Sequence, residues 1–169
     1  MNSEKTALLI VMGASGVGKS TLGESLASTL GWRFVDADSF HSKSSIDKMR
    51  AGLALGEQDR EPWLDRMIAH FEHQKEPAVL AWSGLLLAHR ERFRSLEFQV
   101  RFVHLEGNAD LLKNRLKQRA QHFMPSSQVE NQLDTLEATA GEPDVLHLSA
   151  SEPTLQQNIR TQRWLNQSL

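Results

Sequence analysis

Hydrophobic residues along the chain form five short runs, each with the length of a β-strand. The first run, residues 7–12, is apolar throughout and ends directly before a glycine. This is typical of a central parallel strand that is covered on both faces. The remaining runs cover residues 33–36, 77–83, 98–105 and 144–148. The pattern therefore predicts a sheet of five strands.

Segments with apolar residues at helical spacing lie between these runs. Leu22, Leu26 and Leu30 form one stripe, and Gly31 follows as a stop signal, so we expect a helix over residues 19–30. Further helices are expected to open at residues 61–63, at 109–119, after Ser127 and after Pro153.

Pro62 is expected in the first turn of its helix, where proline is tolerated. Strands that alternate with helices predict an α/β fold class, in which helices cover both faces of a parallel sheet.

The overall composition narrows the classes of partner. The 169 residues contain no internal repeat and have the size of one domain, so we expect a single domain over residues 1–169. A net charge of −2 offers no basic field for nucleic acid or an anionic membrane. Cysteine is absent, which excludes disulfides and thiolate metal sites. No run approaches the roughly 20 apolar residues of a membrane span, and we expect a cytoplasmic protein.

A phosphate-binding loop follows the first strand. It matches the pattern G-x-x-x-x-G-K-[ST], in which glycines curl the backbone so that its amides point at phosphates. The lysine contacts the β- and γ-phosphates, and the hydroxyl after it binds Mg²⁺. A flexible glycine turn is the alternative, but the strand before and the helix after the loop favour a nucleotide site. Its residues are Gly13, Ala14, Ser15, Gly16, Val17, Gly18, Lys19, Ser20 and Thr21.

Two carboxylates end the second predicted strand. Ligands of open α/β sheets bind beyond the carboxyl ends of the strands, so Asp36 and Asp38 are expected to face the phosphate loop. A kinase that acts on a hydroxyl needs one carboxylate near the metal and one to orient or deprotonate the attacking oxygen. We assign Asp36, with Ser20, to the metal and Asp38 to the hydroxyl. The alternative is that both cap the next helix or lie in a solvated turn.

Five blocks in unbroken order, within about residues 8–150, together resemble the gluconate kinases, carbohydrate kinases of the thermoresistant glucokinase type. The blocks are the phosphate loop with residues 36–41, then 45–49, 58–64, 115–124 and 132–137. The resemblance implies a P-loop kinase fold with a five-stranded parallel sheet and a helical lid at about 115–127. It implies transfer of the γ-phosphoryl group of ATP to the 6-hydroxyl of D-gluconate, with Mg²⁺, in a homodimer.

The resemblance also implies roles for single residues. Lys19, Asp38, Arg115 and Arg119 are the expected catalytic residues, the two arginines coming from the lid. The expected substrate contacts are Asp38, His41, Lys48, Arg60, Ser83 and, in the lid, His122.

The chemistry of several of these positions agrees with the resemblance. An arginine binds a carboxylate through two hydrogen bonds, so Arg60 is the best candidate for the acid group of gluconate. Arg115 and Arg119 lie four residues apart and are expected on one helix face, where they neutralise the transferring phosphoryl group. A solvated helix face is the alternative. His41 either contacts substrate or caps the next helix, and Trp63 is expected to pack rather than to touch sugar.

The chain departs from the family pattern after the third strand. Leu86 and Leu87 stand where basic residues are usual, and His89 stands where tyrosine is usual. The acceptor therefore stays open between gluconate, another sugar acid, a polyol and a cyclitol. A nucleotide-binding module without catalysis is the alternative from another class of protein.

Overall fold

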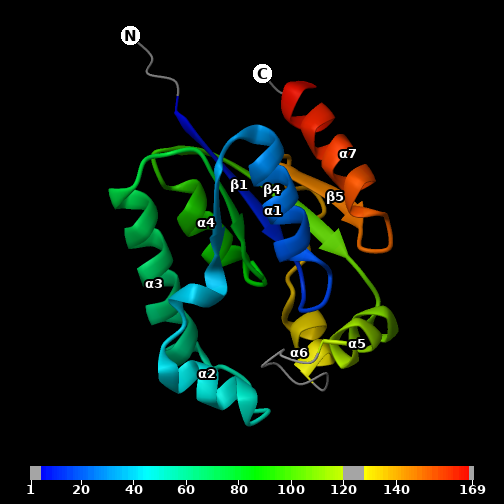
Figure 1. Ribbon diagram of the computed structural model, residues 1–169. Helices are drawn as coiled ribbons and strands as arrows, with labels where there is room; N and C mark the ends of the chain where they lie inside the picture. Colours follow the sequence, from blue (N-terminus) through cyan, green and yellow to red (C-terminus); the bar gives the residue numbers. More distant parts are fainter. Residues whose placement is uncertain (1–4, 120–127, 168–169) are drawn as a thin grey trace.

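The computed structural model describes residues 5–119 and 128–167. Strands and helices alternate over most of this length (Figure 1). The five strands are β1 (Thr6–Met12), β2 (Arg33–Asp36), β3 (Ala78–Ala81), β4 (Phe98–Glu106) and β5 (Val145–Ser149). The helices are α1 (Lys19–Leu30), α2 (Lys43–Arg50), α3 (Glu57–His73), α4 (Leu87–Arg94), α5 (Ala109–Lys117), α6 (Gln128–Thr135) and α7 (Thr154–Gln167), with a short 3₁₀ turn, η1 (Ala37–Phe40).

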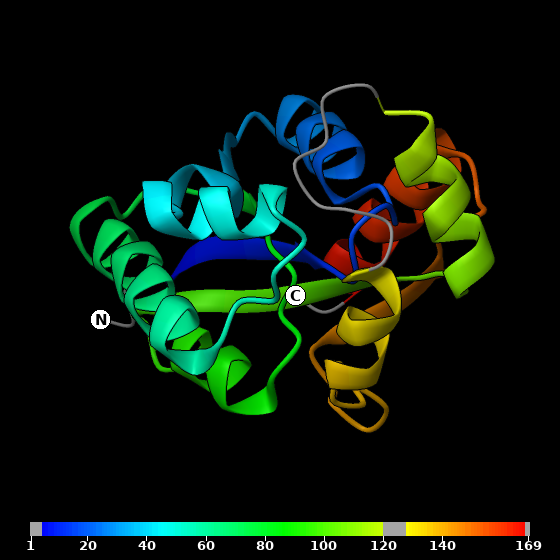
Figure 2. The same cartoon turned by 90° about the horizontal axis from the view of Figure 1, so that it is seen from below.

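All five strands are parallel, and their order in the sheet is β2-β3-β1-β4-β5. Helices α1 and α7 cover one face and α3 and α4 the other (Figure 2). In the central strand β1, Leu8, Ile10 and Met12 join the core under α3 and α4. Leu9 and Val11 join the core under α1 and α5. Burial on both faces explains why this strand is apolar from Ala7 to Met12. The predicted α/β architecture is confirmed.

Helix α3 begins earlier than the sequence pattern indicates. Gly56 is its N-cap, and the Asp59 carboxylate accepts a hydrogen bond from the Gly56 amide at 3.1 Å. Pro62 is therefore the sixth residue of the helix, and its predicted first-turn position is wrong. A proline there leaves the carbonyl of Gln58 without its helical partner. Gln58 is exposed, so water can satisfy that carbonyl.

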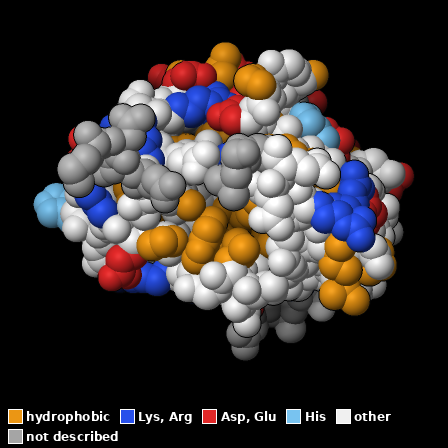
Figure 3. Space-filling view, turned by 90° about the horizontal axis from the view of Figure 1, so that it is seen from above, with side chains coloured by type: hydrophobic (Ala, Val, Ile, Leu, Met, Phe, Trp, Pro, Cys, Tyr) orange, Lys and Arg blue, Asp and Glu red, His pale blue; other side chains and the backbone are white. Residues whose placement is uncertain are grey.

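The end of the molecule at the amino ends of the strands carries no site that the sequence predicts. Figure 3 shows this end, where acidic and basic side chains lie among apolar patches, one of them near the centre of the view. Within the part of the chain that the structure describes, no helix is both long and apolar enough to span a bilayer.

Candidate functional site

A cavity of about 230 Å³ opens at the carboxyl ends of β1, β2 and β3. It is bounded by the loop before α1, the turn η1, helices α2, α3 and α6, and residues 81–89. Of the predicted site residues, it brings together Ser15, Gly16, Gly18, Lys19, Ser20, Asp36, Asp38, His41, Arg60, Ser83 and Arg119. Side chains that are up to about 100 residues apart in sequence thus meet in one place.

The loop between β1 and α1 has the curled backbone that phosphate binding requires. Gly13 has a φ of 139°, and a Cβ atom there would lie 2.6 Å from the carbonyl oxygen of Leu105, so only glycine fits. Gly18 has a φ of 100° and is the N-cap of α1, and as a glycine it has no side chain to accept from the first-turn amides. These amides and the helix dipole remain available for an anion.

Lys19 lies inside the cavity beside the two carboxylates. Its ammonium donates to the carbonyl oxygen of Ala14 at 3.1 Å. Burial lowers the pKa of Lys19 to about 8, while Asp38 and Asp36 oppose this shift. The side chain is therefore still mainly protonated at neutral pH and is placed to contact a phosphate bound in the loop.

The Asp36 carboxylate makes two contacts, one that caps η1 and one with the proposed metal ligand Ser20. Its Oδ1 accepts from the Asp38 amide at 2.9 Å, so it caps η1. Its Oδ2 accepts from the Ser20 hydroxyl at 3.3 Å. Two hard oxygen ligands at about 3 Å fit neighbouring positions of an octahedral Mg²⁺ ion. Ser20 and Asp36 therefore have the chemistry and spacing to hold magnesium.

Asp38 lies next to a stacked pair of aromatic rings. Its side chain is 56% exposed, and its Oδ1 is 3.7 Å from the His41 Nε2 atom. The rings of His41 and Trp63 stack at 4.1 Å, and the Trp63 indole donates to the Ala37 carbonyl at 2.7 Å. Burial, with a smaller effect of Arg66, lowers the pKa of His41 to about 4, so the imidazole is neutral. Trp63 thus packs, as expected, and holds His41 beside Asp38.

The side chain of Ser42, not of His41, caps α2 by accepting from the Ser45 amide. The capping alternative for His41 is therefore wrong. His41 lines the cavity instead.

Arg60 and Lys48 lie on adjacent helices but have different surroundings. Arg60 lines the cavity, and its guanidinium makes no hydrogen bond or ion pair with the residues that the structure describes. The Lys48 ammonium contacts both Asp59 oxygens at 2.9 Å and lowers the pKa of that carboxyl. Lys48 does not line the cavity, so the structure gives it a role in joining α2 to α3 in place of the expected substrate contact.

The segment before α4 forms the far wall of the cavity. Ser83 lines it, and its carbonyl accepts from the Gly13 amide at 3.1 Å. Leu86 and His89 also line it, and His89 Nε2 bonds to Glu61 at 2.9 Å. Leu87 is exposed at the start of α4. Because Leu86 stands where a basic residue is usual, this wall carries less positive charge than the resemblance implies.

Arg90 holds this segment from behind, a role that the sequence did not predict. It is fully buried and donates to the Gly84 carbonyl at 2.7 Å and to Glu142 at 2.7 Å. Nearby, the Glu137 carboxylate accepts from the Leu87 amide, and the Glu137 amide donates to the Leu85 carbonyl at 2.8 Å. The chain after α6 is thus hydrogen-bonded to the segment that forms the far wall of the cavity.

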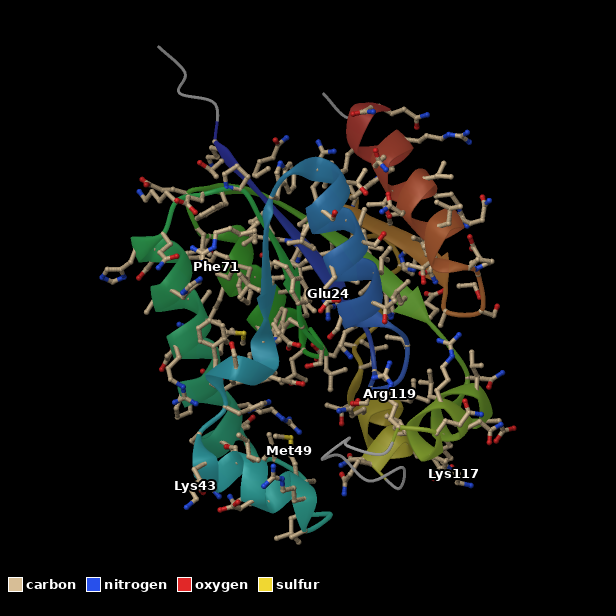
Figure 4. The ribbon with its side chains drawn as sticks, viewed as in Figure 1. Glu24, Lys43, Met49, Phe71, Lys117 and Arg119 are labelled. Atoms are coloured by element: carbon tan, nitrogen blue, oxygen red, sulfur yellow. The ribbon has the colours of Figure 1, made fainter. Side chains whose placement is uncertain are left out.

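The two arginines near the end of α5 do not share a helix face, contrary to expectation. The helix ends at Lys117, so Arg119 lies in the turn that follows, where its amide donates to the Leu116 carbonyl at 3.2 Å. Arg115 donates to the carbonyls of Gly16 and Val17 at 3.3 Å and of Ala150 at 2.6 Å. It therefore supports the phosphate loop from outside. Arg119 lies beside that loop, while Lys117 points away from it (Figure 4).

A second cavity of about 290 Å³ adjoins the first on the side of α7. Gly18 and Arg119 line both cavities, and Val17, Thr21, Arg115 and Thr154 line the second. A ligand whose phosphates lie on the loop can therefore extend into this second space. His122 and residues 120–127 of the expected lid lie outside the described residues.

Gln132 on α6 is a site residue for which the sequence suggested no role. Its Oε1 accepts from the Ser15 amide at 2.7 Å, and Gln132 lines the first cavity. The bond fills one of the phosphate-loop donors with a side-chain oxygen. The only sequence signal was its place in the block 132–137.

Known proteins resemble this chain over most of its length. The shikimate kinase family model matches residues 15–167. A gluconokinase of Gluconobacter oxydans is 36% identical over 151 residues, 88% of this chain and 85% of that protein. One of Arabidopsis thaliana is 41% identical and covers 78% of each chain.

Among solved structures, a gluconokinase of Sinorhizobium meliloti 1021 superposes with a TM-score of 0.82 at 32% identity, covering 98% of this chain and 99% of that one. The sequence identity to these gluconokinases is 32–41% over most of the chain, and the overall structure is shared. The chain belongs to the gluconokinase family, on the fold of the shikimate kinases.

Proposed function

We propose that this protein transfers the γ-phosphoryl group of ATP to the 6-hydroxyl of D-gluconate, giving 6-phosphogluconate. The observation that carries the proposal is the position of Arg60. Its guanidinium has no hydrogen-bond partner among the described residues, and it lies in the cavity that also holds the phosphate loop and Asp38. Relatives named gluconokinase support it. The acceptor needs a cation for its acid end and hydrogen-bonding groups for its hydroxyls, and this cavity contains both.

The nucleotide is assigned to the two adjoining cavities. Its phosphates bind the amides of residues 13–21, Lys19 and the start of α1. Its nucleoside part extends past Gly18 into the second cavity, beside Arg119. Ser20 and Asp36 hold Mg²⁺, which neutralises phosphate charge when bound.

In the transfer step, Asp38 takes the proton from the 6-hydroxyl as its oxygen attacks the γ-phosphorus. A new oxygen–phosphorus bond forms, the bond from the γ-phosphorus to the β–γ bridging oxygen breaks, and ADP leaves. Lys19 and Arg119 stabilise the charge on the transferring group. Neutral His41 cannot repel a proton that moves toward Asp38, and it lies 3.7 Å from that carboxylate.

An acceptor screen tests the proposal directly. ATP turnover is followed by coupled ADP detection with D-gluconate, other sugar acids, neutral polyols and shikimate. We expect D-gluconate to give the highest kcat/KM. Leu86 on the cavity wall favours a second candidate acceptor, a neutral polyol. A higher kcat/KM for a neutral polyol than for D-gluconate would establish that candidate instead. ATP binding without product from any acceptor would mean a module without catalysis.

Replacing Arg60 by leucine is expected to raise the KM for gluconate by about 10- to 100-fold, because a bidentate charged contact is lost. The KM for ATP should change by less than about threefold. Steady-state kinetics measure both constants. Arg163→Leu on the far helix α7 is the matched control and should alter neither. Equal changes in the two constants in Arg60→Leu would place the carboxylate elsewhere.

Replacing Gln132 by alanine is expected to tighten ATP binding by about two- to tenfold, because one hydrogen bond no longer competes for the Ser15 amide. Calorimetry measures the Kd of ATP. Asn131→Ala, the neighbouring cavity residue, whose side chain bonds Gln128, is the control and should leave the Kd unchanged. Weaker binding by Gln132→Ala would mean that Gln132 supports the loop or contacts the phosphates.

The homodimer, which is usual in the family that this chain resembles, belongs to the same proposal. So does the cytoplasmic location, which the sequence led us to expect because it has no cysteine and no long apolar run. Light scattering of the purified protein tests the first, and a mass of one chain would remove it. The partner is proposed to be a small molecule, with no role for nucleic acid or membrane.

A further inference from the structure

Two histidines and a glutamate meet on the sheet, outside both cavities. His104 and Glu106 lie on β4, two residues apart, and His104 is in register with His147 on β5. All three side chains therefore project from the face that α3 and α4 cover. None of them lines the cavities assigned to ATP and acceptor, so the proposed reaction does not use them.

The three side chains are close enough to bind one ion. One ligand atom from each lies within 4.8 Å of the other two. Glu106 Oε1 is 2.8 Å from His147 Nδ1 and 3.7 Å from His104 Nδ1. Ligand atoms around a tetrahedral Zn²⁺ ion, at bond lengths of about 2.1 Å, lie about 3.4 Å apart. The observed distances lie on either side of that value, so small side-chain adjustments suffice.

The surroundings combine a rigid base with access from solvent. His104 is buried, and the hydroxyl of the buried Thr139 lies 2.8 Å from its Nδ1. Glu106 and His147 are 54% and 35% exposed, so an ion can enter from their side. Rotation of the Thr139 side chain about its Cα–Cβ bond moves the oxygen away and frees the His104 nitrogen. The charges of Arg90 and Glu142 also act on His104, and these two groups are paired with each other.

We propose that His104, Glu106 and His147 form a binding site for a divalent transition-metal ion such as Zn²⁺. Two imidazole nitrogens and one carboxylate suit Zn²⁺ or Co²⁺ rather than Mg²⁺, which prefers oxygen ligands alone. A water molecule completes the shell. The ion ties the edge strand β5 to β4, and β5 leads directly into the turn before α7 that lines the second cavity (Figure 1).

The test uses the untagged full chain, stripped of metal and free of nucleotide. Co²⁺ is titrated while its visible absorption is recorded, and Zn²⁺ binding is measured by calorimetry. We expect one ion per chain, absorption bands of a low-coordinate Co²⁺ complex, and a melting temperature that rises with Zn²⁺ concentration. No stoichiometric binding of either ion would overturn the proposal.

Matched histidine variants locate the site. His147→Ala is expected to weaken Zn²⁺ binding by at least about tenfold and to abolish the melting shift, and Glu106→Gln should weaken it as well. His73→Ala, an exposed histidine on α3, should bind as the original chain does. Zn²⁺ binding that survives His147→Ala unchanged would place the ion elsewhere. The Mg²⁺-dependent kinase activity of His147→Ala should persist, which also shows that this variant folds.

Discussion

Asp38→Asn is expected to reduce kcat for gluconate phosphorylation by about 10²- to 10⁴-fold, the usual contribution of a positioned general base. The carboxamide has nearly the same shape as the carboxylate but cannot take the proton of the attacking hydroxyl. The cap of η1 is kept, because it uses the Asp38 backbone amide and the Asp36 side chain. The fold and ATP binding should therefore survive.

Steady-state turnover and the Kd of ATP from calorimetry separate these effects. Asp47→Asn, an exposed carboxylate on the nearby helix α2, is the control and should keep full turnover. If Asp38→Asn retains turnover within about tenfold, another group accepts the proton. A large loss of ATP affinity with the same variant would instead assign Asp38 to the nucleotide or its metal.

Lys19→Ala is expected to lower turnover by roughly 10²- to 10³-fold or more, because a fixed positive charge is removed from the transferring phosphate. The variant should be at least as stable as the original chain at pH 7. Burial lowers the pKa of Lys19 to about 8 from 10.5, so below pH 8 the buried ammonium disfavours the folded state. That cost fades as the pH rises from 8 towards 10.5, and alanine removes it at every pH.

Kinetics and thermal unfolding at pH 7 test both halves of this prediction. Lys117→Ala is the control, since that side chain points away from the loop (Figure 4). Turnover near the original value in Lys19→Ala would remove the lysine from the mechanism. A melting temperature well below that of the original chain would show that Lys19 stabilises the fold. The Ala14 carbonyl and the two carboxylates would then more than offset the cost of burying its charge.

Local sequence patterns were sufficient to predict those strands and helices whose structure depends on their own residues. Unbroken apolar character placed the central strand, because burial on both faces leaves no position for a polar side chain. The stripe of leucines and Gly31 placed α1 within its observed bounds. The start of α3 was misplaced because a glycine cap with a backing aspartate is a weaker signal than the nearby Pro62.

Side-chain roles that depend on distant partners were harder to predict. Lys48 was assigned to substrate, but Asp59 on the next helix binds it at 2.9 Å. Arg115 and Arg119 were expected on one face, but the helix ends between them and Arg115 turns to backbone carbonyls of the phosphate loop. The sequence analysis assigned no role to Arg90, which is fully buried and holds the segment before α4.

The sequence by itself determined the phosphate loop, the order of strands and helices along the chain, and the carboxylates after the second strand. Each of these depends on residues that are neighbours in the chain. Only the tertiary structure decided that Arg60 faces the cavity while Lys48 does not, that Gln132 occupies the Ser15 amide, and that His104, Glu106 and His147 meet. A side chain's role depends on what packs against it, and those contacts come from segments that folding brings together from distant parts of the chain.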